Sequence, residues 1–426
     1  LEQGGFLVGT EPYTHNIGQC YRCKTDIEPA VSRQWFVRIA PLAKEAIAAV
    51  VTGKTRIVPP TWEATYFEWM NNIRDWCISR QIWWGHRIPV WTCEGCGKLI
   101  VVAQDPDRCP DCGGAKLRQE EDVLDTWFSS GLWPFSTLGW PENTEALKTF
   151  YPTSLLVTGF DILFFWVARM MMMGLYVMKE VPFRDVYLHA LVRDENGEKM
   201  SKSKGNSIDP LEMMDKFGTD AFRFTLAAFT AQGRDVRMSE ERIEGYKFFV
   251  NKIWNATRFS MINLEDYDAA VPVRKEDGSI ADRWIRARLN RTIAEVVRGL
   301  DEYRFNDAAA AVYQFVWHEF CDWYLEMTKL YLYREGDQKR QDLTRQTLLE
   351  MLDAILRLLH PFMPFITEEI WQQLPFKKED GSIMKATFPK PHERFDDEPV
   401  AEEMNLVIEI ITAIRNIRGE MNVPPG

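Results

Sequence analysis

Residues 185–206 read DVYLHALVRDENGEKMSKSKGN, an apolar run that passes directly into a lysine-rich loop. The run 185–192 and the earlier run SLLVTG at 154–159 predict two buried parallel strands of an α/β sheet, separated by an apolar helix that begins near Asp161. The loop after the second run then lies at the carboxyl edge of the sheet. This edge is where α/β folds bind their ligands.

The loop carries Lys199, Lys202 and Lys204 within six residues, with small residues between them. A generic run of Lys and Ser is usually a solvated loop. A mobile cationic loop at a ligand-binding edge, however, suits a triphosphate, because its ammonium groups stabilise the charge that develops on a departing pyrophosphate.

The apolar pattern divides the chain into an α/β part and an all-helical part. Helical periodicity begins near Phe222 and continues almost to the end of the chain. We predict an irregular first segment, a second segment with the sheet and a Cys-rich insert at 93–112, a helical third segment and a last single helix. Their bounds are 1–58, 59–221, 222–395 and 396–426.

Pro59-Pro60-Thr61 is a favourable helix start, and the aromatic residues after it predict a helix that runs to about residue 80. Tryptophans recur every seven residues at 62, 69, 76 and 83, which would keep them near one helical face. We expect this stripe to pack into the core.

Two Cys-x-x-Cys pairs, Cys93 with Cys96 and Cys109 with Cys112, are separated by twelve residues and flanked by glycines. Two such turns can aim four thiolates at one point, which predicts a tetrahedral zinc site. Four sulfur ligands leave no open position, so the zinc would be structural. Metal-binding pairs of this kind also indicate a reducing compartment, and we expect a cytoplasmic protein.

A third pair, Cys20 and Cys23, is only half of a possible site, because no further pair remains in the sequence. Either its partner ligands lie upstream of Leu1 or the pair binds nothing.

The formal charge of −11 over 426 residues argues at first against a nucleic-acid partner, since phosphate contacts favour clustered Lys and Arg. Between Arg283 and Arg298, however, five arginines stand against one acid, Glu295. This segment is either a solvated helix or a patch that faces RNA.

The apolar stretch 155–178 is the one candidate membrane span in the sequence, and Asp161 and Arg169 interrupt it. We interpret it as a buried strand and helix, and we expect no membrane association.

The complete string KMSKSKGN matches the KMSKS signature of class I aminoacyl-tRNA synthetases, and the chain as a whole resembles the valyl-tRNA synthetase family. The supporting strings, in the order of that family, are WCISRQIWWGHRIPVW at 76–91, DVLDTWFSS at 122–130, TGFDILFFW at 158–166 and HALVRD at 189–194. Residues 305–326 and 359–374 look like its helical anticodon-binding domain. Isoleucyl and leucyl enzymes share KMSKS but not the TGFDILFFW string.

The resemblance implies an α/β fold that is the second half of a Rossmann-like class I catalytic domain with a zinc-ribbon insert. An all-α anticodon-binding bundle follows it. Segment 1–58 would then be the junction after an editing domain, and segment 396–426 a helix that leads toward a further segment. The implied activity is ATP-dependent activation of valine to valyl-adenylate with Mg²⁺, followed by transfer to tRNA(Val).

Site residues follow from the same resemblance, position by position. Lys199 and Lys202 would act on the phosphates. The ATP site would comprise Gly159, Asp161, His189, Ala190, Leu191, Val192, Lys199, Met200, Ser201 and Lys202. The valine site would comprise Trp127, Asp161, Ile162 and Trp166.

The segment His15-Asn16-Ile17-Gly18 resembles the HIGH signature of the same enzymes but lacks its final histidine, because Gln19 follows. We therefore expect the HIGH half and most of the editing domain to lie before Leu1, and a coiled coil to lie after Gly426. Alone, the 426 residues should be inactive, and the enzyme should be a monomer. The alternatives are a non-catalytic zinc-containing tRNA-binding module and an isoleucine-activating synthetase.

Overall fold

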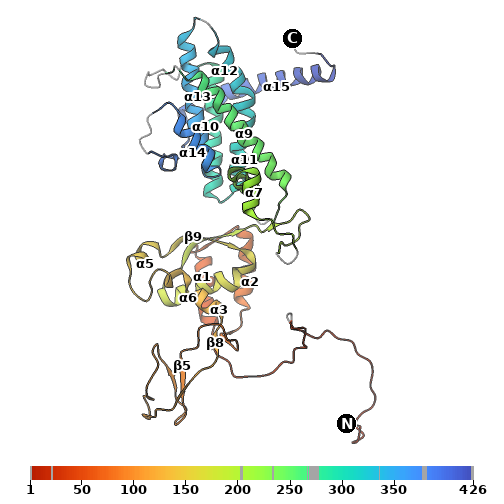
Figure 1. Ribbon diagram of the computed structural model, residues 1–426, viewed down its shortest axis with the longest axis vertical. Helices are drawn as coiled ribbons and strands as arrows, with labels where there is room; N and C mark the ends of the chain where they lie inside the picture. Colours follow the sequence, from red (N-terminus) through yellow and green to blue (C-terminus); the bar gives the residue numbers. More distant parts are fainter. Residues whose placement is uncertain are drawn as a thin grey trace.

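The computed structural model describes residues 2–20, 23–201, 205–232, 235–265, 267, 278–334, 336–376 and 381–423. Figure 1 shows an α/β unit, a long helical bundle beside it and an N-terminal segment that extends away from both. The Cys-rich insert, which contains β5, projects from the end of the α/β unit opposite the bundle.

The two apolar runs form neighbouring parallel strands, as predicted. β9 (Thr153–Gly159) and β10 (Phe183–His189) pair in register, with His189 opposite Gly159 at the carboxyl ends. β10 is the central strand, because β2 (Arg56–Val58) pairs with its other side and completes the order β2-β10-β9. The strands are parallel, so their carboxyl ends meet at one edge of the sheet.

Helices cover this sheet and bury its apolar side chains. α1 (Ala40–Val51) precedes β2, and α6 (Ala168–Met178) connects β9 to β10. A 3-10 turn at Phe160–Ile162 and a π-helical stretch at Leu163–Val167 lead into α6. The segment Phe160–Met178 is long and apolar enough to cross a membrane by composition alone. In the structure Met170, Met171 and Met172 are buried in the core that surrounds the sheet.

The prediction of one helix that runs to about residue 80 is wrong beyond Asn71. A 3-10 turn at Pro60–Trp62 and α2 (Glu63–Asn71) are followed by two short strands, β3 (Trp76–Cys77) and β4 (Ser79–Arg80). β3 pairs with β1 (Phe36–Val37), and β4 pairs with β8 (Val123–Leu124). Long-range strand pairing therefore overrides the seven-residue spacing. Trp76 is buried in the core, whereas Trp83 is fully exposed.

The Cys-rich insert is a small antiparallel sheet in the order β6-β5-β7. Its strands are β5 (Val90–Cys93), β6 (Leu99–Val101) and β7 (Leu117–Gln119). Between the insert and β9 lie three short helices: α3 (Thr126–Gly131), α4 (Trp133–Ser136) and α5 (Glu145–Phe150).

After β10 the chain crosses to the bundle through a second small cluster. It contains β11 (Val192–Arg193), α7 (Pro210–Phe217), α8 (Thr219–Phe229) and β12 (Val236–Arg237), which pairs with β11. The predicted border at 221/222 falls inside α8. Phe222 packs into this cluster, while Phe224 packs into the core of the bundle.

The bundle packs around two long helices, α10 (Ile280–Asp301) and α13 (Gln338–Leu359). Ser279 and Asp282 form a capping box at the start of α10, which satisfies backbone N–H groups there. The bundle also contains α9 (Glu240–Asn263), α11 (Phe305–Gln314), a π-helical stretch at Phe315–Tyr324, α12 (Leu325–Leu332), α14 (Pro364–Gln373) and α15 (Glu398–Glu420). Short 3-10 turns lie at Ile383–Lys385 and Glu393–Phe395.

Candidate active site and metal centre

The carboxyl edge of the sheet brings together four predicted ATP-site residues. Gly159 ends β9 opposite His189, and a methyl group on Gly159 would come within 2.6 Å of Asp161 Oδ1 and 3.7 Å of Leu191 Cδ2. Gly159 therefore lets the Asp161 carboxylate turn back over the strand end. Asp161 itself is exposed, so its carboxylate is open to a ligand.

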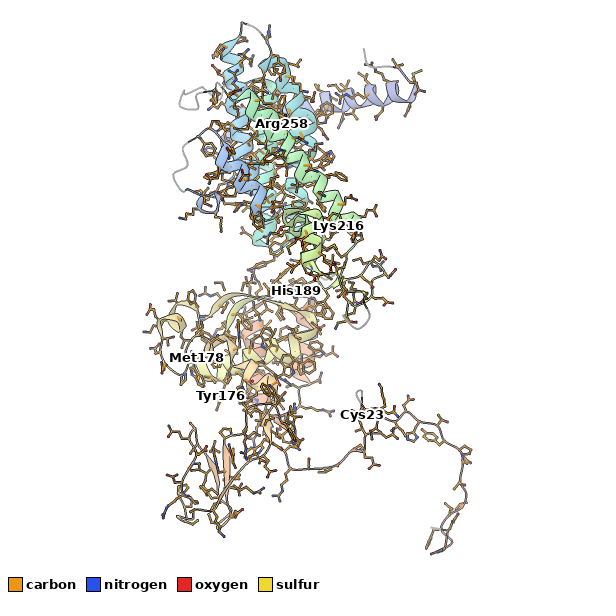
Figure 2. The ribbon with its side chains drawn as sticks, viewed as in Figure 1. Cys23, Tyr176, Met178, His189, Lys216 and Arg258 are labelled. Carbon is orange, nitrogen blue, oxygen red and sulfur yellow. The ribbon has the colours of Figure 1, made fainter. Side chains whose placement is uncertain are left out.

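The segment after β10 is fixed by a second carboxylate. Asp235 accepts the backbone N–H of Leu191 at 3.3 Å and also pairs with Arg193. Val236 donates its backbone N–H to Leu191 O at 2.9 Å, next to the β11–β12 pair that contains Val192. His189 Nδ1 lies 2.8 Å from Ala190 O. Hydrogen bonds thus hold the residues after the strand end, and Figure 2 places His189 where the α/β unit meets the bundle.

An asparagine closes the base of the lysine loop. Asn206 Nδ2 donates to Asp194 Oδ2 at 2.9 Å, and Ser201 donates its backbone N–H to Asn206 Oδ1 at 3.0 Å. The hydrogen bond from Asn206 holds the pKa of Asp194 below its usual range. Met200 packs against the cluster that includes Ala190, and Lys199 is exposed. Lys202, the other predicted phosphate contact, lies outside the described residues.

The predicted valine-site residues lie on two facing elements. Trp127 is in α3, and its ring stacks on Phe165 of the π-helical stretch at 6.2 Å. Trp166 donates its indole N–H to Ser130 O at 3.1 Å, which ties the same two elements together. Ile162 ends the preceding 3-10 turn and is half-buried. Aromatic and branched side chains thus make an apolar wall beyond the strand end.

Asp125, which sequence reasoning missed, anchors this wall. It is 5 % exposed and caps α3 by accepting the backbone N–H of Trp127 at 3.4 Å. It also accepts the Trp76 indole N–H at 2.9 Å and pairs with Arg80 at 3.0 Å and Arg169 at 3.6 Å. Burial lowers the pKa of the Arg169 guanidinium, which lies 4.0 Å from the Trp76 ring centroid.

Sequence signals for the missed residues existed but were weak. Asp125 precedes a helix as a capping residue should, and Asp194 and Asn206 both stand inside the quoted motifs. Their roles depend on partners that folding alone brings close. Spacing therefore could not assign them.

Four cysteines converge in the insert, as the spacing predicted. Cys93 and Cys112 Sγ atoms lie 3.6 Å apart, as do those of Cys96 and Cys109, and all four fall within 4.8 Å of one another. A tetrahedral ion with zinc–sulfur bonds of about 2.3 Å separates its sulfurs by about 3.8 Å. The arrangement therefore fits a structural zinc ion.

The described residues at the pair Cys20 and Cys23 repeat one hydrogen bond of the two pairs in the insert. Lys24 donates its backbone N–H to Cys20 O at 2.9 Å, as Gly97 does to Cys93 O at 2.8 Å and Gly113 to Cys109 O at 2.9 Å. The donor residues share a left-handed backbone, with φ of 60°, 73° and 72°. Cys20 and Lys24 thus match the corresponding residues of the two pairs in the insert, and Figure 2 shows Cys23 on the extended N-terminal segment.

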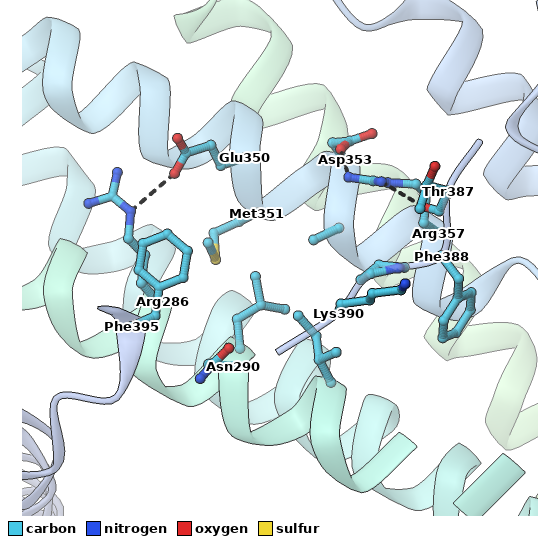
Figure 3. Close-up of a pocket in the computed structure, with 14 residues that line it drawn as sticks. Arg286, Asn290, Glu350, Met351, Asp353, Arg357, Thr387, Phe388, Lys390 and Phe395 are labelled. Carbon is cyan, nitrogen blue, oxygen red and sulfur yellow. Dashed lines mark hydrogen bonds and ion pairs between the residues drawn. The ribbon is translucent and has the colours of Figure 1, made fainter. Parts of the chain in front are cut away.

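The arginines of α10 do not form a free basic patch. Four of the five pair with carboxylates: Arg283 with Asp397 at 2.6 Å, Arg286 with Glu350 at 3.1 Å, Arg288 with Glu319 at 2.6 Å and Arg291 with Glu295 at 3.4 Å. Figure 3 shows Arg286 and Glu350 beside a cavity of about 370 Å³ between α10, α13 and the chain near Thr387. Because most of these arginines are neutralised by carboxylates, the pairing argues against an RNA-facing patch on α10.

Comparison with known proteins agrees with this geometry. A family model for class I tRNA synthetases (I, L, M and V) matches residues 16–239, and one for the anticodon-binding domain of tRNA ligase matches residues 282–426. The chain is 60% identical to the valine–tRNA ligase of Syntrophotalea carbinolica and 61% identical to that of Geobacter sulfurreducens. Both matches cover all of this chain but 47% and 48% of the relatives, so the chain spans about half their length.

Solved structures share the fold. Mycobacterium tuberculosis methionyl-tRNA synthetase in complex with methionyl-adenylate superposes with a TM-score of 0.66 at 20% identity, over 86% of this chain and 68% of that one. The Agrobacterium radiobacter LeuRS–tRNA complex gives a TM-score of 0.60 at 22% identity, over 76% and 43% of the two chains. These likenesses show a shared fold, and the family model shows the group to which the chain belongs. The chain belongs to the class I tRNA synthetases of the isoleucine, leucine, methionine and valine group.

Proposed function

We propose that this chain is part of a valine–tRNA ligase, which activates valine with ATP and transfers it to tRNA(Val). The observation that carries the proposal is the identity of 60–61% over the whole chain to proteins of that name. Two strings shared with the family, TGFDILFFW at 158–166 and HALVRD at 189–194, begin at the carboxyl ends of β9 and β10, where a nucleotide and a small amino acid could lie side by side.

In the proposed reaction the valine carboxylate attacks the α-phosphate of ATP in line, and pyrophosphate leaves. This chemistry requires no protein nucleophile, so the protein contributes positioning and charge stabilisation. Gly159 and the strand end at His189–Val192 would hold the adenosine, and the exposed Asp161 would accept from the ribose or the valine ammonium group. Lys199 and Lys202 would stabilise the departing pyrophosphate, with Mg²⁺ carried by ATP neutralising the phosphates.

The apolar wall of Trp127, Ile162 and Trp166 would face the valine side chain. A wall of this kind separates side chains that differ by one methylene by only about 1–3 kcal/mol. We expect valine to be preferred over isoleucine to roughly that extent. The four-cysteine site would hold structural zinc, remote from the chemistry.

The test is amino-acid-dependent ATP–pyrophosphate exchange by a full-length ligase that contains this chain. We expect exchange with valine, weak exchange with isoleucine, and none from residues 1–426 alone. Equal or better exchange with isoleucine would move the assignment to the isoleucine enzyme. Robust exchange by the isolated 426 residues would show that this chain holds a complete activation site.

Two lysine variants sharpen the test. Lys202→Ala or Lys199→Ala should lower the exchange rate by a factor of about 100 or more while leaving valine binding nearly unchanged, because the donors act on charge that develops late. Lys216→Ala is the matched control, since Lys216 is exposed and pairs with Glu240 on α9. A rate equal to that of the control would remove the lysines from this role.

A further inference from the structure

A short turn of the bundle is inserted against the central strand of the sheet. Residues 302–304 connect α10 to α11, and Arg304 donates its backbone N–H to Gly299 O at 2.7 Å. Tyr303, in the middle of the turn, has a φ of 56°. A left-handed backbone is unfavourable for a bulky aromatic residue, so the surrounding contacts must hold Tyr303 in place.

The contacts that hold it come from β10 and its neighbour β2. Tyr303 donates its hydroxyl to Asp185 Oδ2 at 2.8 Å, and Arg56 donates to both oxygens of the same carboxylate at 3.0 and 2.7 Å. The Tyr303 ring lies 5.7 Å from that of Tyr187, and Phe305 meets Tyr187 edge-on at 5.6 Å. Tyr187 is 3 % exposed. Two strands of the α/β unit are thus joined to one turn of the bundle.

A third segment binds the same turn from another side. Gln232 donates its side-chain N–H groups to Glu302 O at 3.0 Å and to Tyr303 O at 3.2 Å. Asp235, three residues further on, is the carboxylate that fixes Leu191. The turn is therefore tied both to the strand that ends at His189 and to the segment that holds the residues after it.

The register of β10 makes this contact relevant to the site. Asp185, Tyr187 and His189 are two residues apart, and side chains at this spacing share one face of a strand. The face of β10 that receives Tyr303 is consequently the face on which His189 stands. A displacement of the turn would act directly on the strand that carries the catalytic edge.

We propose that Tyr303, Asp185 and Gln232 form a rigid joint that sets the bundle at a fixed position on β10, so that a tRNA bound to the bundle is aligned with the catalytic edge. Tyr303 is a positioning residue in this scheme and touches no reacting atom. The inference rests on the proposed function for its tRNA partner. The joint itself stands on the contacts between the two units.

The test compares two RNAs on the 426-residue chain, using fluorescence anisotropy. A full tRNA(Val) transcript can contact both units, whereas its isolated anticodon stem–loop can contact the bundle alone. Loosening the joint lowers the effective concentration of the second contact, so Tyr303→Ala should weaken binding of the full tRNA about tenfold and of the stem–loop less than twofold. Equal losses for both RNAs, or no loss for either, would overturn the proposal.

Conservative and control variants separate the joint from general damage. Tyr303→Phe removes the hydrogen bond to Asp185, and Asp185→Ala removes the same bond together with the Arg56 pair. The double variant should therefore bind the full tRNA no more weakly than Asp185→Ala alone, because Tyr303→Phe then has no further bond to remove. Additive losses would contradict the joint. Tyr333→Ala is the control, since Tyr333 is 63 % exposed near the end of α12.

Hydrogen exchange provides a readout that needs no RNA. Tyr303→Ala should accelerate amide exchange in peptides from β10 and from residues 299–305, with peptides of α13 unchanged. Unchanged exchange in β10 would overturn the joint. If the unmodified chain bound neither RNA, the proposed function would fail, and the exchange result would still decide whether the joint exists.

Discussion

The helical bundle and the carboxyl edge of the sheet use their charged residues in opposite ways. In the bundle, arginines of α10 pair with carboxylates of α13 and the π-helical stretch and with Asp397, which directly precedes α15, so their charge is neutralised within the bundle. At the sheet edge Asp161 and Lys199 are exposed, while buried or bonded carboxylates such as Asp125 and Asp194 fix the backbone around them. A charged residue that stabilises the fold therefore cannot be told from one that binds a ligand by sequence alone. The two differ in the residues that surround them in the structure.

We expect the largest change in stability when metal is removed from the insert. Structural zinc contributes about 10–16 kcal/mol of apparent binding energy in small domains, so chelation should unfold residues 88–119 and leave the bundle intact. Hydrogen exchange of insert and α13 peptides, with and without chelator, measures this. Cys109→Ser should lose the metal, whereas Cys321→Ser should retain it, because Cys321 packs against the core of the bundle and is not one of the four converging cysteines. Less than about half an equivalent of zinc in the unmodified chain would count against the site.

Truncation of a buried side chain tests how the core of the bundle contributes to stability. Trp284 on α10 is 1 % exposed, so Trp284→Ala should destabilise the bundle by about 3–5 kcal/mol in urea unfolding. Trp254→Ala should change stability by less than about 0.5 kcal/mol, since Trp254 is half-exposed. Similar losses for the two variants would mean that the bundle core is not centred on α10.

The paired arginines are the next test. Arg288 binds both Glu319 oxygens, at 2.8 and 2.6 Å, and the pKa of Arg288 is raised by that carboxylate. Arg288→Ala should cost about 1.5–3 kcal/mol of stability. Arg291→Ala should cost less than about 0.5 kcal/mol, because its pair with Glu295 is exposed. A stable Arg288→Ala protein with weakened tRNA binding would instead place this arginine at the RNA interface.

The smallest effect concerns pH at the contact between the two units. The Arg56 guanidinium, and then the Tyr303 hydroxyl, lower the pKa of Asp185, so its ionised form stabilises the fold above about pH 4. This contribution is lost as pH falls through the lowered pKa. Because Arg56 is largely exposed, the effect should be only a fraction of a kcal/mol. The stability difference between the unmodified chain and Asp185→Asn should therefore shrink between pH 5 and pH 3. An unchanged difference would contradict a stabilising role for ionised Asp185.

Those parts of the molecule that depend on local pattern could be predicted from the sequence. The runs at 154–159 and 185–192 revealed parallel strands because both faces of such strands are buried. The spacing of the two Cys-x-x-Cys pairs likewise predicted that their four cysteines would converge. The lysine loop was recognisable because its string is contiguous.

Features that depend on distant partners could not be predicted. The tryptophan spacing predicted one long helix, but Trp76 is bound by Asp125, 49 residues later, and lies in a strand. The Arg288 partner, Glu319, is 31 residues away, and that of Arg283 is 114 residues away. Only folding brings such partners together. The sequence therefore showed the cluster of arginines but not whether carboxylates would pair with them.

The strand order also fixes a sequence of events during synthesis. Arg56 of edge strand β2 and Asp185 of central strand β10 are 129 residues apart. At about 5–20 residues per second, roughly 6–26 s pass on the ribosome before the edge strand can find its neighbour. Throughout that interval β2 and α1 have no sheet to pack against, while the insert can already fold around its own cysteines. The insert is thus the first part of the α/β unit able to become native, and the sheet is completed around it.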